Sequence, residues 1–129
     1  MGRLALDYRD LDVYKLARKT AIEIQSLSKS FPDEEKYSLT DQVRRSSRSI
    51  CANIAEAWRT RDHPKAFSHS LQIVESEASE TRVWLDFANC FGYLTQEYYR
   101  ELDDRYDHIL RMLHKMRASS QAWCRQPTA

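Results

Sequence analysis

Apolar side chains recur along the chain in alternating three- and four-residue steps, the period of helices that bury one face. The clearest run follows Thr95. Its apolar positions are Tyr99, Leu102, Tyr106, Ile109, Leu113 and Met116. Such spacing is typical of the packing seam of a helical bundle. The run predicts a helix over about residues 96–118.

Three further amphipathic helices are predicted before this one, and their ends carry local signals. They cover about residues 10–30, 39–60 and 64–91. The Phe31-Pro32 pair ends the first helix, and Pro64 fits the first turn of the third, where proline costs no hydrogen bond. Ser38 is placed to cap the second helix, and Gly92 lies just past the end of the third.

Four helices with short joints favour an all-α, antiparallel up-down-up-down four-helix bundle. The 129 residues suit a single domain over 1–129, and we expect residues 126–129 to be a frayed tail. The chain has only 2 Gly and 3 Pro, which argues against a turn-rich all-β fold and removes Gly-rich phosphate loops.

Charge is balanced over the whole chain but uneven along it. The chain has 20 Lys and Arg against 19 Asp and Glu, so its net charge does not indicate a nucleic-acid or membrane partner. Between Gln42 and Lys65, however, six basic residues accompany two acidic ones. The six are Arg44, Arg45, Arg48, Arg59, Arg61 and Lys65. At about 100° per residue, the first four fall opposite Val43, the expected centre of the buried face.

Three interpretations of this basic face stay open. It is a solvated helix face, a surface that binds the phosphates of RNA or DNA, or a surface that forms salt bridges between subunits. The third interpretation has a partner in the acidic third helix. Its acidic residues are Glu75, Glu77, Glu80 and Asp86.

The third helix is apolar nearly all round in its second half, so a second face needs covering. Its outward residues include Val83, Trp84, Phe87 and Phe91. Either the chain ends, Leu4–Leu11 or the region of Trp123, fold over them, or another copy of the chain does. We expect self-association, with these four residues in the interface.

Asn53 and Glu56 flank the buried stripe of the second helix. We expect them to hydrogen-bond a neighbouring helix or subunit and to fix its register, as part of the same assembly. A catalytic carboxylate is the weaker interpretation, because no partner for acid-base chemistry is evident.

The motifs of catalysis and metal binding are missing from the sequence. No His has an acidic residue three positions before it, and Ser46, Ser47 and Ser49 lack a nucleophile elbow. The three cysteines, Cys51, Cys90 and Cys124, form no Cys-x-x-Cys pair. We therefore expect no enzymatic activity, catalytic residue, metal, cofactor or small-molecule substrate. We also expect a cytoplasmic protein without membrane association, because the N-terminus has no signal-like apolar stretch.

Several polar and apolar positions together resemble the bacterial family of ribosomal RNA intervening-sequence proteins, over about residues 8–117. They are Asp10-Leu11, Val13, Ala17, Phe31-Pro32, Glu35, Leu39-Thr40, Gln42, Arg44-Arg45, Ser49-Ile50, Asn53-Ile54-Ala55-Glu56 and Gly92-Tyr93-Leu94. The run from Thr40 to Glu56 is the most specific, because bundle packing alone does not dictate its polar residues.

The resemblance implies a small cytoplasmic four-helix bundle that assembles into a homopentamer and has no established enzymatic activity. Some members of that family are encoded inside insertions in the large-subunit ribosomal RNA gene. Related bundles serve diversity-generating retroelements, where a basic pentamer contacts nucleic acid and a reverse transcriptase.

Two residues depart from the family pattern in the second helix. Cys51 stands where the family usually has proline, and Ala57 stands where it usually has glycine. Both changes remove a residue that bends helices, so we expect a straighter helix here.

Overall fold

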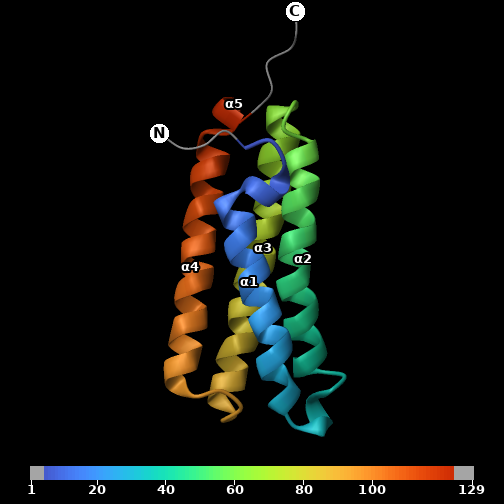
Figure 1. The fold of residues 1–129 in the computed structure, drawn as a ribbon, viewed down its shortest axis with the longest axis vertical. Helices are drawn as coiled ribbons and strands as arrows, with labels where there is room; N and C mark the ends of the chain where they lie inside the picture. The colour runs from blue at the N-terminus through green and yellow to red at the C-terminus, as the bar shows by residue number, and fades with distance from the viewer. Residues whose placement is uncertain (1–4, 124–129) are drawn as a thin grey trace, which may run out of the picture.

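The chain forms four long helices that run alternately up and down (Figure 1). The computed structural model describes residues 5–123. Its long helices are α1 (Asp12–Leu27), α2 (Leu39–Arg59), α3 (Pro64–Cys90) and α4 (Gln96–Ala118). Within residues 5–123 there is no strand. The predicted all-α fold and all four long helices are therefore confirmed.

Short elements at the joints account for the differences from the predicted boundaries. They are the 3₁₀ turns η1 (Tyr8–Asp10), η2 (Ser28–Ser30) and η3 (Asp33–Glu35), and the one-turn helix α5 (Ser120–Trp123). The first predicted helix was too long at both ends, because η1 and η2 occupy its expected termini. The expected tail at 126–129 lies outside the described residues.

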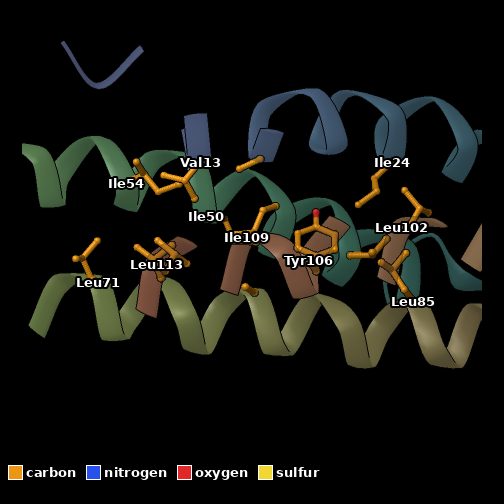
Figure 2. Packing of buried hydrophobic residues seen from close by; sticks show 14 of the residues in the cluster. Val13, Ile24, Ile50, Ile54, Leu71, Leu85, Leu102, Tyr106, Ile109 and Leu113 are labelled. Carbon is orange, nitrogen blue, oxygen red and sulfur yellow. The ribbon is translucent and has the colours of Figure 1, made fainter. Parts of the chain in front are cut away.

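Each long helix packs against the next one, and α4 returns to pack against α1. Figure 2 shows the resulting core, in which all four helices point apolar side chains toward the bundle axis. Fully buried examples are Ile24 of α1, Ile50 of α2, Leu85 of α3 and Tyr106 of α4. Burial of such side chains contributes on the order of 1.5–3 kcal/mol each, which makes this core the main source of stability.

Local signals set most of the helix ends as predicted. Pro64 occupies the first turn of α3, and the Thr95 hydroxyl oxygen accepts a hydrogen bond from the Tyr98 amide at 3.1 Å at the start of α4. Gly92, which follows α3, has a φ of +79°, in the left-handed region that favours glycine.

Ser38 is the N-cap residue of α2, as predicted, but its side chain makes no capping hydrogen bond. The Ser38 hydroxyl instead donates to Glu35 Oε1 at 2.5 Å, and the same oxygen accepts from the Leu39 amide at 3.4 Å. Turn η3 brings Glu35 back over the start of α2, so its carboxylate, and not the Ser38 hydroxyl, accepts a hydrogen bond from an amide of the first turn. These hydrogen bonds and another from the Tyr93 hydroxyl at 2.9 Å hold the pKa of Glu35 below its usual value.

Helix α2 continues without interruption through the two positions that depart from the family pattern. Ala57 is buried in the core, and Cys51 is half-buried with its thiol 3.9 Å from the Ser47 carbonyl oxygen. Burial raises the pKa of Cys51 to about 11, so this thiol stays protonated and unreactive at neutral pH.

Ion pairs link α4 to both of its neighbouring helices, α1 and α3. Arg105 pairs with Glu23 across the α1–α4 edge. Across the α3–α4 edge, Arg82 Nε lies 2.8 Å from Asp103 Oδ1 and Arg117 Nε lies 2.7 Å from Glu75 Oε2. The arginines on these two edges are therefore neutralised by neighbours within the chain.

Tyr106 is the largest fully buried side chain, and its hydroxyl has no hydrogen-bond partner among the described residues. Burial also raises the pKa of its phenol, so the group stays neutral. A buried hydroxyl without a hydrogen-bond partner destabilises the folded state. A phenylalanine ring at the same position avoids that cost.

We therefore predict that Tyr106→Phe raises the free energy of unfolding by about 1 kcal/mol. Urea titration followed by circular dichroism measures the change, and Phe67→Leu, which removes core volume, is the destabilised comparison. A loss of stability in Tyr106→Phe would contradict the prediction, because it would mean that the hydroxyl is hydrogen-bonded.

Candidate nucleic-acid interface

The outer side of α2 carries three exposed arginines, Arg45, Arg48 and Arg59, here called the α2 basic face. They are exposed because Val43 and Ile50 turn the opposite side of the helix into the core. Arg45 is 72% exposed and lies 3.6 Å from Asp41 Oδ2. Arg48 Nε donates to the Arg44 carbonyl oxygen at 3.1 Å, a contact that leaves its positive charge unneutralised.

Arg44 does not lie on this outer face, although the helical wheel grouped it there. Its Nε donates to the Ser28 hydroxyl oxygen at 2.7 Å, and its side chain is half-buried. The correction follows from packing, because the end of α1 covers the side of α2 on which Arg44 lies. Arg44 therefore ties α2 to α1.

Arg61 and Lys65 lie past the end of α2. The Arg61 guanidinium stacks 3.9 Å from the centroid of the Trp58 ring, and its Nη1 donates to the Trp58 carbonyl oxygen at 2.7 Å. Lys65 is exposed in the first turn of α3. Arg61 instead shares with Arg59 a hollow of about 620 Å³ between η1 and α2.

The α2 basic face is not purely cationic. Asp41 and Glu56 share the outer side of α2, and Glu56 and Asp7 also line the hollow beside Arg59. The face therefore combines three arginines with the carboxylates of Asp41 and Glu56.

The apolar face of α3 is exposed as predicted by its pattern. The side chains of Val83, Phe87 and Phe91 are 48%, 43% and 53% exposed, and Trp84 is half-buried. The rings of Phe87 and Phe91 have centroids 5.7 Å apart. The four residues thus form one continuous aromatic and aliphatic strip, here called the α3 apolar strip.

The described parts of the chain ends do not cover the α3 apolar strip. Both lie at the opposite end of the bundle from the α3–α4 joint (Figure 1). Trp123 packs on Trp58, with ring centroids 6.4 Å apart, and η1 packs on α1 and α2. The interpretation that residues 5–11 or Trp123 fold over this strip is therefore wrong.

Asn53 finds its partner in the neighbouring helix of the same chain. Its Nδ2 donates to Glu77 Oε1 at 2.6 Å and to the Ser49 hydroxyl oxygen at 3.0 Å. A second buried polar link, from the Thr81 hydroxyl to Ser46 Oγ at 2.9 Å, joins the same two helices. Together they set the register of α2 on α3. Glu56, in contrast, is exposed.

A second group of cations, on α1, was missed by the sequence interpretation. Lys15, Arg18 and Lys19, here called the α1 basic patch, line a shallow hollow of about 400 Å³ with Arg9 and Tyr14. Their spacing of three and four residues places them on one side of a helix, which is the signal that could have revealed them.

The described residues show neither a metal site nor a membrane span. Over residues 5–123 no group of three His, Cys, Asp or Glu side chains is arranged to hold a metal ion. No helix in this part of the chain is long and apolar enough to cross a bilayer.

These features define the class of the protein as a small all-α four-helix bundle with charged outer faces. The chain belongs to the family of 23S rRNA-intervening sequence proteins, whose model matches residues 9–115. The expected resemblance is thus confirmed.

A solved structure from Bacteroides thetaiotaomicron VPI-5482 is similar to the chain. It is described as a protein of unknown function from the S23 ribosomal protein family. The two chains are 30% identical with a TM-score of 0.74, and the match covers 83% of this chain and 96% of the other. Among curated proteins, none matches the chain.

Proposed function

We propose that this protein is a non-catalytic, self-assembling bundle that binds the phosphate backbone of RNA or DNA through the α2 basic face. The observation that carries the proposal is the contrast between the two sides of the molecule. Arg82, Arg105 and Arg117, at the edges between α4 and its neighbours, are paired with carboxylates and are at most 32% exposed. Arg45, Arg48 and Arg59 are exposed, with Arg45 lying 3.6 Å from Asp41.

Guanidinium groups suit this role because their planar fork matches two phosphate oxygens at once. The 15 residues from Arg45 to Arg59 span about 21 Å of helix, enough to follow several nucleotides. Asp41 and Glu56 reduce the affinity of one copy. Assembly compensates, because several copies on one oligomer bind the same strand with higher avidity.

Self-association through the α3 apolar strip is the second part of the proposal. An exposed strip of Val83, Phe87 and Phe91 beside Trp84 is the kind of surface that aromatic-rich interfaces bury. We propose a homo-oligomer, with five copies as the family resemblance implies, acting in the cytoplasm.

The alternative function is a protein-interaction scaffold that binds no nucleic acid. In that case the α2 basic face pairs with carboxylates of a neighbouring subunit or of another protein. Glu80 and Asp86 on α3 are exposed and provide such carboxylates. The two functions differ in their response to salt and to phosphate polymers.

We predict that the protein binds a fluorescein-labelled 20-nucleotide RNA in 50 mM salt and that log Kd rises steeply with log salt concentration. Replacing the α2 basic face (Arg45→Gln, Arg48→Gln, Arg59→Gln) should lower that slope by about 2, at roughly 0.7 per lost phosphate contact on a single strand. Fluorescence anisotropy across a salt series measures the slope.

A matched control removes three exposed cations from α4 instead: Arg100→Gln, Arg111→Gln and Lys115→Gln. This variant should keep the slope of the unchanged protein. Absence of RNA and DNA binding by the unchanged protein at 50 mM salt would overturn the proposal in favour of the scaffold.

We predict that Phe87→Glu lowers the molar mass in solution toward the 15.3 kDa of a single chain, because a charge buried at the interface costs several kcal/mol. Multi-angle light scattering measures the mass. Ile22→Glu, at an apolar position on α1 that is 53% exposed against 43% for Phe87, should leave it unchanged. An unaltered oligomer in Phe87→Glu would remove the α3 apolar strip from the interface.

A further inference from the structure

The α1 basic patch has the chemistry of a phosphate site. Four of the five residues that line its hollow are cations, and the fifth is Tyr14, whose hydroxyl can donate to a phosphate oxygen. The lining contains no carboxylate. This distinguishes it from the hollow at the end of α2, where Asp7 and Glu56 lie beside the arginines.

The charges of the α1 basic patch are not neutralised within the described part of the chain. The ion pairs and side-chain hydrogen bonds found over residues 5–123 do not include the side chains of Lys15, Arg18 or Lys19. Glu23, one turn after Lys19, is the natural partner, but it pairs with Arg105 of α4.

The spacing of these cations destabilises the isolated helix. Lys15 and Lys19 are like charges four residues apart, which destabilises a helix by a few tenths of a kcal/mol. An anion bound between them removes that repulsion. The patch is therefore better suited to a bound anion than to solvent alone.

The α1 basic patch is next to the α2 basic face. Figure 1 shows α1 and α2 side by side, and they pack directly. Arg18 lies close enough to Cys51 of α2 for its positive charge to lower the pKa of that thiol, against the larger effect of burial. Cys51 lies one turn from Arg48. Packed helix axes are about 8–10 Å apart, so one strand can reach cations on both helices.

We propose that Lys15, Arg18 and Lys19 hold phosphates of the same single strand that the α2 basic face binds, so that the nucleic-acid surface spans two helices. This inference rests on the proposed function. It assigns to α1 a direct contact with the strand. Arg9 adds to the patch from η1, where it pairs with Asp7 at 2.9 Å.

The test compares a variant of the α1 basic patch with the unchanged protein and the α4 control. The variant is Lys15→Gln, Arg18→Gln and Lys19→Gln, all exposed positions where glutamine preserves helix propensity. Circular dichroism and thermal unfolding confirm that each variant is folded. Binding of the labelled 20-nucleotide RNA is then measured by anisotropy over a salt series.

We expect the α1 variant to bind at least about tenfold more weakly at 50 mM salt and to lose about 2 from the salt slope, while the α4 control stays unchanged. Because the patch recognises phosphates, a 20-nucleotide DNA should show the same loss. Poly-glutamate of equal length should compete poorly, since its planar carboxylates carry the same single charge as a phosphodiester but lack its tetrahedral arrangement of oxygens.

The outcomes separate the inference from the function on which it rests. If the unchanged protein binds and the α1 variant behaves like the α4 control, the inference is overturned and the α2 surface remains. If the unchanged protein binds neither RNA nor DNA, both are overturned. If poly-glutamate competes as well as RNA, or the loss is confined to RNA, phosphate recognition by α1 is wrong.

Discussion

Burial of one apolar stripe from each of four antiparallel helices is the constraint on which the rest of this protein depends. Once Ile24, Ile50, Leu85 and Tyr106 point to a common axis, the rotation of every helix is fixed, and with it the identity of every outward residue. Polar links at the α2–α3 contact, from Asn53 to Glu77 and from Thr81 to Ser46, hold the register of those two helices. Outer surfaces are then free to differ in chemistry.

Those outer surfaces divide the molecule by charge and polarity. Ion pairs join α4 to both of its neighbouring helices, α1 and α3. Helix α3 exposes an apolar strip, whereas α1 and α2 expose most of their cations. A balanced total charge hides this division, because carboxylates such as Glu23, Glu75 and Asp103 neutralise arginines of the same chain. Our account assigns the apolar strip to self-association and the cationic side to nucleic-acid phosphates.

The fold was predictable from sequence because helix period, Pro64, Thr95 and Gly92 all agreed on the same four segments. The site was predictable only in part. A helical wheel places Arg45, Arg48 and Arg59 correctly, since it needs only the direction of the core. It misplaces Arg44, because the neighbouring end of α1 is invisible to it.

Other features depended on contacts that spacing along the chain does not encode. Glu35 accepts a hydrogen bond from the first amide of α2, and from the Ser38 hydroxyl, because a 3₁₀ turn folds it back. The α1 basic patch was overlooked, and it becomes notable only when Glu23 is seen to be engaged by Arg105. Whether its charges are neutralised depends on side chains that the fold brings near it, and not on its spacing along the chain.

The most direct test of a two-helix nucleic-acid surface is a map of amide chemical-shift changes in the ¹⁵N-labelled protein during titration with a 20-nucleotide RNA. The account predicts that the largest changes fall at residues 15–19 of α1 and 45–59 of α2, and that they decrease as salt is added. Changes concentrated on α3 and α4, or no changes at low salt, would contradict it.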